Sequence, residues 1–382
     1  MIYLDNAATS FPKPPEVAEA ITDLLTHRAG NPGRSGHSLA LAAEAVVAET
    51  RRLLAALLGI QDPARLAFTP NATDALNLAM WGLLRAGDRV VTTSMEHNAV
   101  ARPLFALAER GVDVVRLPSA PDGTLDLDDL ERELRAAPTR LVVMTHASNV
   151  CGTILPIRAA AELAHRHGAL ILVDAAQTAG VLPIDVQEQS IDLLAIAGHK
   201  GLLGPTGTGG LYVAPGVRLT PMRQGGTGAR SEQLSQPEEM PDALESGTVN
   251  TVGIAGLGAA LRVLQATGIE AVRARESALT TRLLAGLREI GGVTVYGPVE
   301  PSQRVAVVSV TLRGWEPVDV QAALDSAFSI AVRAGLHCAP LAHRTLGTFP
   351  LGTVRLAPGY STTDDQIDQT LAALRELTLS AS

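Results

Sequence analysis

Between residues 65 and 196 the chain alternates short apolar runs with longer stretches whose apolar residues recur at helical spacing. The short runs are typical of strands that are buried on both faces of a parallel sheet. The stretches between them have the length and one-sided pattern of amphipathic helices. We expect strands at 65–68, 89–92, 112–117, 141–145, 170–173 and 191–196, and helices at 74–84, 98–110, 126–137 and 157–167. This alternation predicts right-handed crossovers and an α/β fold, with helices on both faces of the sheet.

Outside this region the pattern predicts two long helices before the sheet and a smaller α+β unit after it. The expected helices lie at 14–25, 38–58, 254–267, 269–290, 318–327 and 363–378, and further strands at 207–213, 293–296, 305–312, 330–333 and 353–356. The strand at 207–213 is expected to be antiparallel, and residues 218–241 form a polar, glycine-rich excursion. We expect a large domain at 15–255 and a small domain made of 1–14 and 256–382.

Polar residues follow the predicted strands, at the edge of a parallel sheet that usually carries the ligand. These residues are Thr73, His97, Asn149, Asp174, Gln177, His199 and Lys200. A lysine and an aspartate on neighbouring strand ends suggest pyridoxal phosphate, which needs an amine for a Schiff base and an anion for its pyridine nitrogen. Taken alone, such an aspartate is more often a cap and such a lysine more often solvated.

The segment from Arg65 to Leu84 predicts a strand, a turn and a helix. The free N–H groups at the start of that helix are a natural seat for a phosphate. The alternative is an ordinary helix start that is capped by Asn71 or Thr73. Both interpretations stay open from this unit alone.

Composition narrows the class of protein. The chain has 382 residues, of which 46% are hydrophobic and 3% aromatic, and a net charge of −8. The negative charge argues against nucleic acid as a partner. Two cysteines, Cys151 and Cys338, make no disulfide framework and fit a reducing cytoplasm. We expect no signal peptide, no membrane span and no metal ligands.

Seven motifs in order together resemble the class V aminotransferase family of pyridoxal-phosphate enzymes, and are most similar to its cysteine desulfurases and selenocysteine lyases. The motifs are YLDNAAT at 3–9, EHNAV at 96–100, SNVCGT at 148–153, VDAAQ at 173–177, GHKGLLGPTG at 198–207, ESGTVNT at 245–251 and RAGLHCAP at 333–340. The resemblance implies fold-type I, with a large domain built on a mostly parallel, seven-stranded sheet, a small C-terminal domain and a homodimer.

The resemblance also implies roles for the polar residues. Lys200 would hold the cofactor and shuttle protons, Asp174 would pair with the pyridine nitrogen, and His97 would stack on the ring. Gln177 and Asn149 would bond to the phenolate oxygen or the substrate. The Ala72 amide, Thr73 and His199 would hold the phosphate, and Thr248 would reach the phosphate of the partner subunit. Arg355 would bind the substrate carboxylate as a bidentate fork, and Asn31 and Ala8 would line that end.

One position departs from the family. Ala197 stands where relatives usually carry Ser or Thr to the phosphate. Loss of one hydroxyl is expected to weaken cofactor binding by about 1 kcal/mol.

Which reaction of the family this chain would catalyse depends on Cys338, since in the desulfurases a cysteine thiolate takes sulfur from the substrate. Such a thiol belongs on an exposed or mobile loop, and Cys338 lies in a segment with Gly and Pro up to Gly352. We expect Arg333 and His337 to lower its pKa. The alternative is a buried structural cysteine, which is the interpretation we favour for Cys151.

The leading hypothesis is an L-cysteine desulfurase that gives L-alanine and a persulfide on Cys338, for iron–sulfur clusters or other thiolation pathways through a protein acceptor. The nearest alternative is a selenocysteine lyase. Another is a different class V reaction, by an aminotransferase or epimerase, with Cys338 incidental. A last alternative is a sulfur-relay scaffold without turnover, against which the presence of Lys200 counts.

Overall fold

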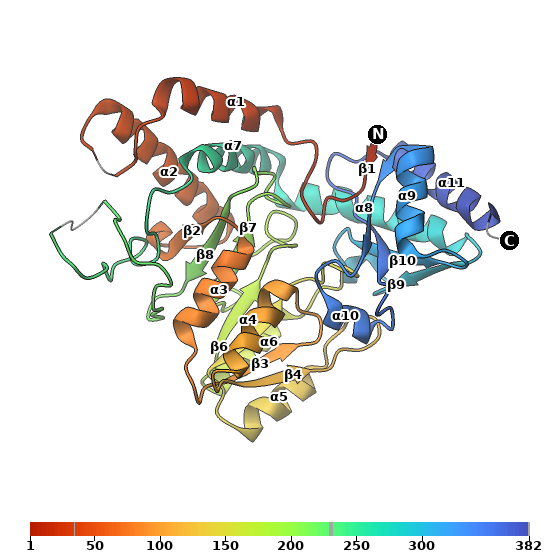
Figure 1. The fold of residues 1–382 in the computed structure, drawn as a ribbon, viewed down its shortest axis with the longest axis horizontal. Coiled ribbons are helices and arrows are strands. Elements are labelled where there is room, and N and C mark those ends of the chain that lie inside the picture. Colours follow the sequence, from red (N-terminus) through yellow and green to blue (C-terminus); the bar gives the residue numbers. More distant parts are fainter. Residues whose placement is uncertain (34, 229–231, 381–382) are drawn as a thin grey trace.

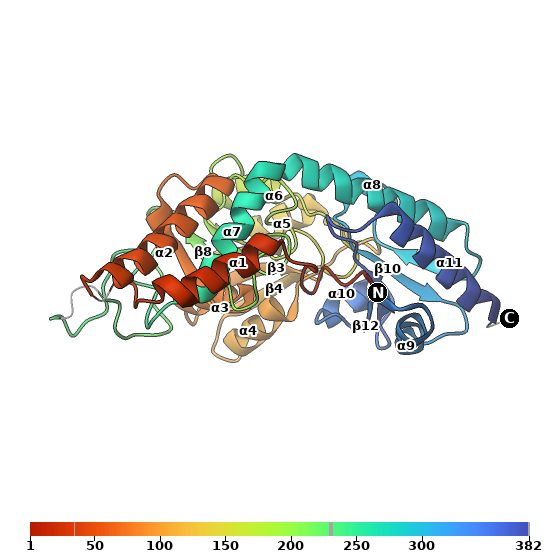
Figure 2. The ribbon, with the colours of Figure 1, turned by 90° about the horizontal axis from the view of Figure 1, so that it is seen from above.

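The structure is a computed structural model that describes residues 1–33, 35–228 and 232–380. The polar excursion expected at 218–241 thus lies partly outside the described residues. The ribbon in Figure 1 shows a larger part around the central sheet and a smaller part that holds the C-terminus. A long helix, α8 (Ile269–Arg288), runs along the smaller part, as Figure 2 shows from above.

The larger part is built on a seven-stranded sheet in the order β2-β8-β7-β6-β5-β3-β4. Its strands are β2 (Leu66–Thr69), β3 (Arg89–Thr93), β4 (Asp113–Leu117), β5 (Leu141–Thr145), β6 (Leu170–Asp174), β7 (Leu193–Ala197) and β8 (Gly209–Val213). Strands β4, β3, β5, β6 and β7 run parallel, whereas β8 is antiparallel to both of its neighbours. This confirms the predicted mostly parallel sheet, with the strand at 207–213 reversed.

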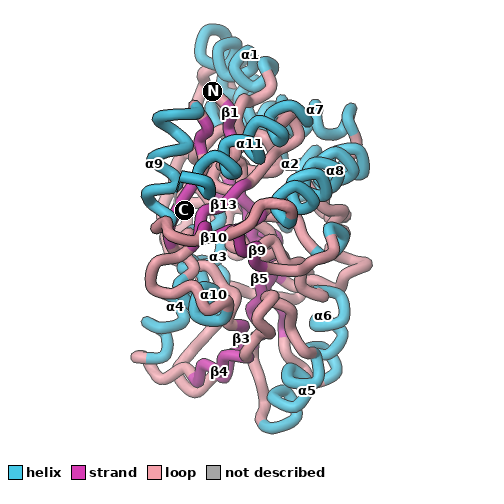
Figure 3. The backbone as a smooth tube through the Cα atoms, turned by 90° about the vertical axis from the view of Figure 1, so that its right-hand side faces the viewer, coloured by secondary structure: helices cyan, strands magenta, loops and turns pink. Residues whose placement is uncertain are grey.

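Helices cover both faces of the sheet, as expected from the alternation. Figure 3 shows α4 (Asn98–Ala108) on one side of β3 and β5, with α5 (Leu127–Ala136) and α6 (Ile157–Arg166) on the other. One face packs against α3 (Ala72–Leu83) and α4 (Asn98–Ala108). The opposite face packs against α2 (Ser38–Leu57), α5 (Leu127–Ala136), α6 (Ile157–Arg166) and α7 (Thr251–Thr267). Helix α1 (Pro15–Asp23) lies outside on α7.

A close backbone approach fixes the turn between β2 and α3. A Cβ atom on Gly209, the first residue of β8, would lie 2.6 Å from the backbone carbon of Asn71. Only glycine lets β8 pass this close to the residue that begins α3. The N-terminus of α3 is thereby held at the edge of the sheet where β7 ends.

The smaller part is an antiparallel sheet in the order β12-β13-β10-β9, with helices packed on it. Its elements are β9 (Val293–Tyr296), β10 (Val308–Leu312), β12 (Arg333–Gly335), β13 (Thr353–Leu356), α8 (Ile269–Arg288), α9 (Pro317–Phe328) and α11 (Asp364–Ser380). The N-terminal strand β1 (Ile2–Tyr3) joins this part, because it pairs with β11 (Ile330–Ala331).

Two differences from the sequence pattern concern the C-terminal region. The run expected as one strand at 330–333 is two short strands, β11 and β12, in separate sheets. The segment after Cys338, expected as a loop, contains a short helix, α10 (Pro340–Thr345). Its first residue is a proline, which is tolerated at that position because no intrahelical N–H bond is needed there.

The buried apolar residues form separate clusters under the two sheets. Leu257, Leu261 and Leu264 of α7 belong to the cluster under the seven-stranded sheet, whereas Leu279 and Leu283 of α8 belong to the cluster of the smaller part. The division at 15–255 against 1–14 and 256–382 stays a prediction, and this packing favours a boundary further along, near the start of α8.

Among the described residues, no single helix is long and apolar enough to cross a membrane. Helices α7 and α8 pass the length and composition test only when taken together, and the chain bends by 81° between them.

Candidate active site

A cavity opens where β5, β6 and β7 end, against the N-terminus of α3. All seven polar residues predicted from the strand ends line it: Thr73, His97, Asn149, Asp174, Gln177, His199 and Lys200. Ala72, which the family resemblance implied, lines it too. Parallel strands bring their carboxyl ends to one edge of a sheet, which explains this convergence. Side chains that are up to 128 positions apart in the sequence thus share one small space.

Asp174 and Lys200 form the electrostatic centre of this cavity. Burial raises the pKa of the Asp174 carboxyl, while the N–H of Ala176, 2.9 Å from Oδ1, and the charge of Lys200 act against that rise. Burial lowers the pKa of Lys200 to about 8, although Asp174 and Cys338 act to raise it. A cation beside Asp174 would therefore stabilise the charged form of this carboxyl. Because the pKa of Lys200 is close to physiological pH, part of its amine is neutral, and the neutral form is the reactive one.

Both histidines of the cavity are neutral near pH 7. Burial, together with the positive charge of Lys200, lowers the pKa of His97 and of His199 to about 4. His97 caps α4, since its Nδ1 accepts a hydrogen bond of 3.0 Å from the Ala99 N–H. In the neutral ring the proton therefore lies on Nε2.

The N-terminus of α3 offers donors to an anion. The first N–H groups of a helix have no partner within it, and Ala72 and Thr73 are the first two residues of α3. Asn71 also caps the helix, with Oδ1 accepting from the Asp74 N–H at 2.8 Å, so the cap and the free amides occur together. The Nδ1 atom of His199 lies beside them, buried and without a hydrogen-bond partner among the residues that the structure describes. Ala197 lines the same corner and adds no donor of its own.

Cys338 lies in a strained turn between β12 and α10. It is exposed, and both His337 and Cys338 have positive φ, +48° and +59°, which non-glycine residues rarely adopt. The backbone oxygen of Cys338 accepts a hydrogen bond of 2.7 Å from the N–H of Asn98. Asn98 is the first residue of α4 and directly follows the capping residue His97. This bond ties the cysteine turn to the helix that carries a cavity residue.

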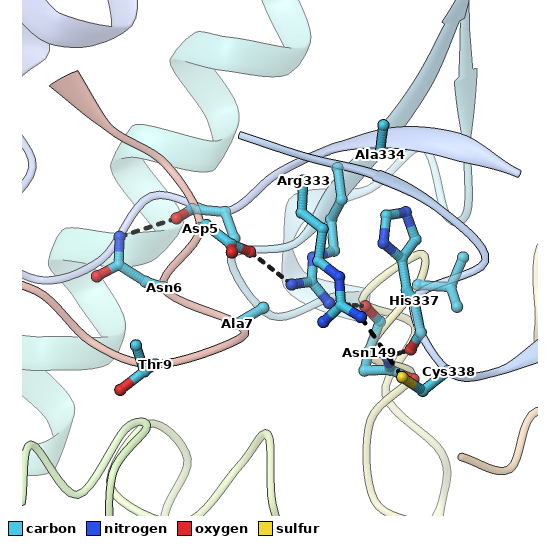
Figure 4. A network of polar contacts seen from close by, with 12 residues as sticks. Asp5, Asn6, Ala7, Thr9, Asn149, Arg333, Ala334, His337 and Cys338 are labelled. Atoms are coloured by element: carbon cyan, nitrogen blue, oxygen red, sulfur yellow. Dashed lines mark hydrogen bonds and ion pairs between the residues drawn. The ribbon is translucent and has the colours of Figure 1, made fainter. Parts of the chain in front are cut away.

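Arg333 is the cation that contacts the thiol, with its Nη2 3.4 Å from Sγ (Figure 4). His337 was expected to act on Cys338 in the same way, but it is buried, and its pKa falls to about 2. The His337 ring therefore carries no positive charge near the thiol. It bonds instead to the Thr353 hydroxyl, at 3.2 Å.

Arg355 lies at the inner end of the same polar network, 1% exposed, but does not line the cavity itself. Its Nη2 donates to Asp5 Oδ1 at 2.7 Å and its Nη1 to the backbone oxygen of Asn149 at 3.0 Å. Its Nε is buried and has no hydrogen-bond partner in the described part of the chain. The expected carboxylate fork is thus occupied by Asp5 in this structure, and its role toward a substrate stays a prediction.

The amide side chains of the cavity are also engaged. Asn149 Nδ2 donates to the His337 oxygen at 2.7 Å, and Gln177 Nε2 donates to the Ala7 oxygen at 3.0 Å. The first bond links the cavity to the cysteine turn, and the second links it to the N-terminal segment. Ala8, next to Ala7, lies in that segment but does not line the cavity.

Two predicted site residues lie elsewhere. Thr248 is exposed and lines a different hollow, beside Thr69 and Arg223. Its hydroxyl is 3.5 Å from Oδ1 of Asn31, which is also exposed. Within one chain, neither residue reaches the cavity that holds Lys200. The buried Cys151, with Sγ 3.0 Å from the Thr153 hydroxyl, has the structural environment that was expected.

Two charged residues near the cavity were missed by the sequence analysis. Glu96 is buried with Oε1 accepting from the Thr93 hydroxyl at 2.6 Å and the Thr145 N–H at 3.1 Å. Lys13 donates from Nζ to the His199 backbone oxygen at 2.8 Å. Glu96 could have been found because it directly precedes His97 in a motif. Nothing in the sequence pointed to Lys13, since a lysine between two prolines in a turn is ordinarily expected to be exposed to solvent.

Comparison with known proteins identifies the family. The model of the aminotransferase class V family matches residues 2–370, and the chain belongs to that family. A probable cysteine desulfurase of Methanothermobacter thermautotrophicus is 35% identical over 98% of this chain and 94% of that protein. A cysteine desulfurase of Escherichia coli strain SE11 is 36% identical over 89% of this chain and 84% of that protein.

A solved structure agrees with these sequence relatives. The apo structure of a cysteine desulfurase from Thermococcus onnurineus NA1 has a TM-score of 0.93 and 34% identity, over 99% of this chain and 95% of that one. The fold is therefore the fold-type I architecture that the resemblance implied, with both the seven-stranded sheet and the smaller C-terminal part matched.

Proposed function

We propose that this protein is a pyridoxal-phosphate-dependent cysteine desulfurase that converts L-cysteine to L-alanine and keeps the sulfur as a persulfide on Cys338. The observation that carries the proposal is the position of Cys338. An exposed thiol contacts Arg333 and is tied by its backbone to α4, beside a cavity that holds Lys200 and Asp174. The similarity to cysteine desulfurases over nearly the whole chain supports it.

The cavity residues fit pyridoxal phosphate. The unpartnered Nδ1 of His199 and the N-terminal amides of α3 suit the phosphate, the buried carboxyl of Asp174 suits a protonated pyridine nitrogen, and the Lys200 amine suits the aldehyde. When bound, this cofactor withdraws electrons from the α-carbon of an attached amino acid.

The chain's own residues would then prepare the substrate. Lys200, with a pKa of about 8, is able to accept and return a proton at the substrate α-carbon. Arg355 would bind the substrate carboxylate, which replaces Asp5 at the guanidinium. His97 would contact the cofactor ring as a neutral imidazole, so that it adds no charge against Lys200.

Cys338 would perform the sulfur transfer. Its thiolate, with Arg333 beside it, forms a bond to the substrate sulfur while the substrate carbon–sulfur bond breaks. A proton takes the place of sulfur on that carbon, and L-alanine leaves. The net change is thiol plus L-cysteine to persulfide plus L-alanine, which balances without an oxidant. The persulfide then lies on an exposed turn, where a protein acceptor or a thiol reductant has access to it.

We further propose a homodimer with shared active sites and a cytoplasmic location. Thr248 and Asn31 support the dimer, because both are exposed and neither lines the cavity of its own chain. A reducing compartment suits two free cysteines, one of them exposed.

The test compares alanine and sulfide release from L-cysteine, in the presence of a thiol reductant, by the parent protein, Cys338→Ala and Cys151→Ala. We expect both products from the parent and from Cys151→Ala. Cys338→Ala should lose at least about 100-fold of both, because the sulfur has no acceptor.

Equal alanine formation by parent and Cys338→Ala would contradict the proposed thiol step. No alanine from the parent protein loaded with cofactor would contradict the desulfurase proposal itself, and L-selenocysteine would be the next substrate to test.

A further inference from the structure

A second cavity, of about 390 Å³, lies between the larger and the smaller part of the molecule. Its lining includes residues of the N-terminal segment 6–16, Val263 on α7, Glu276 on α8, and the segments 305–307 and 358–361. It shares Lys200 and Gln177 with the candidate active site but none of that site's other lining residues. Its volume is in the range of cavities that hold small organic ligands.

The lining is mostly apolar and includes two amines, those of Lys13 and Lys200. Among the described residues, Lys13 has no carboxylate as an ion-pair partner. Lys13 Nζ donates to the Ser10 hydroxyl at 2.7 Å and to the His199 backbone oxygen at 2.8 Å. An ammonium has three donors, and the third has no partner among the described residues. Glu16 lines the same cavity, but the structure records no ion pair between it and Lys13. Burial lowers the pKa of Lys13 to about 8, as expected for a cation that no carboxylate compensates.

Glu276 does not supply the missing negative charge. It is 8% exposed, and burial raises the pKa of its carboxyl to about 8, against the opposing effect of Arg273. The carboxyl is therefore largely protonated at pH 7. The cavity thus combines apolar walls, the Lys13 ammonium with a free donor, the Lys200 amine that it shares with the candidate active site, the neutral acid of Glu276 and the exposed Glu16 at its margin.

We propose that this cavity binds a small monocarboxylate with an apolar chain, whose carboxylate accepts a hydrogen bond from Lys13 Nζ. Its chain packs on the apolar wall that includes Val263, and the ligand bridges the two parts of the molecule. The site adjoins the candidate active site, because Lys200 and Gln177 line both cavities. No turnover is needed for this binding, so the inference does not depend on the proposed function.

Calorimetric titration with hexanoate tests the site, on the protein with the cofactor it carries when purified. We expect the parent to bind hexanoate, Lys13→Met to bind it about 10-fold or more weakly, and hexan-1-ol to bind more weakly than hexanoate. Val263→Phe should also weaken binding, because its ring fills the cavity. Arg262→Met is the control: it removes a nearby exposed charge that does not line the cavity, and it should change the affinity less than twofold.

Several results would overturn the inference. One is no binding of hexanoate to the parent at millimolar concentration, and another is equal binding of hexan-1-ol. Binding that survives both Lys13→Met and Val263→Phe would place the carboxylate elsewhere, for example at Arg355. Circular dichroism checks that each variant is folded. Lys13→Met and Val263→Phe change different walls of the cavity, so each tests the site independently of the other.

Discussion

At Lys200 burial outweighs the attraction of Asp174, and the pKa falls to about 8. The neutral amine is the form that attacks an aldehyde. The rate at which cofactor-free protein takes up pyridoxal phosphate should therefore rise about tenfold per pH unit below pH 8 and level off above it. Stopped-flow absorbance over a pH series measures this rate.

Asp174→Asn is a second variant for the same measurement, because it tests how the charge of Asp174 affects the pKa of Lys200. Asp174 raises the pKa of Lys200, so its removal should move the midpoint of the pH profile below that of the parent. A parent midpoint near 10.5, the ordinary value for lysine, would contradict the electrostatic description of the cavity.

Glu96 makes a second pH-dependent contribution, this time to stability. Burial raises its pKa from 4.5 to about 8, with Asp174 adding to the rise. The folded state then binds one proton more than the unfolded state between these values, so this contribution is complete below pH 4.5 and is lost as the pH rises to about 8. Glu96→Gln keeps an oxygen for Thr93 and Thr145 but cannot ionise.

Urea unfolding of both proteins at several pH values tests this contribution. Relative to Glu96→Gln, the parent should lose up to about 1.4 kcal/mol of unfolding free energy per pH unit between pH 5 and 8. Parallel stability curves for the two proteins would show that Glu96 is already ionised in the folded state.

The sequence predicted the cavity residues better than their hydrogen bonds. Strand ends placed Asp174, His97 and Lys200 correctly, because parallel topology sets their location without reference to distant contacts. Whether a group such as His337 or Lys13 is charged depends on burial by remote segments, which local pattern does not contain. The engagement of Arg355 by Asp5, 350 positions away, was unpredictable for the same reason.

At the scale of elements, Arg304 connects the larger part to the smaller one. It is fully buried, and its guanidinium donates to four backbone oxygens, those of Cys151, Tyr296, Pro298 and Val307, at 2.7–3.0 Å. Cys151 follows β5, whereas Tyr296 ends β9. A single side chain thus fixes how the turn after β5 lies against the antiparallel sheet.

Arg304→Met should destabilise the protein by about 3 kcal/mol or more, because three buried oxygens and the partly buried oxygen of Tyr296 lose their donor. Arg304→Lys should not restore stability, since an ammonium lacks the planar fork that reaches separate carbonyls. Urea unfolding measures both, with the exposed Arg313→Met as control. A loss below about 1 kcal/mol in Arg304→Met would mean that water or a rearranged loop replaces the guanidinium.

Elements were predictable where the periodic pattern was long. Helix α2 occupies 38–57, where the apolar spacing predicted 38–58, and the reversed β8 was also foreseen. Helix α10 was missed because its six residues are fewer than two turns, too short for a periodic signal. The cluster to which α7 belongs depends on tertiary packing against α1 and α2, which its own sequence does not specify.

At the scale of the whole molecule, the separation of Thr248 from Lys200 leads to a prediction about the dimer. Thr248 is exposed and faces a hollow outside the candidate active site of its chain. If Thr248 completes the phosphate site of the partner subunit, Thr248 and Lys200 of one chain act in different active sites of the dimer. The protein should then sediment at about twice its chain mass of 39.8 kDa.

Mixed dimers separate action across the interface from action within one chain. Lys200→Ala alone should be inactive, and Thr248→Ala alone should need about 5-fold or more cofactor for full activity, because a charged hydrogen bond is lost. In a dimer of one Lys200→Ala chain and one Thr248→Ala chain, one site keeps both its own Lys200 and the partner's Thr248. That site should give half the activity of a parent dimer, at the parent's cofactor requirement, in desulfurase assays of co-expressed, doubly tagged protein.

If the mixed dimer kept the raised cofactor requirement of Thr248→Ala, the threonine would act within its own chain, and its exposure would need another explanation.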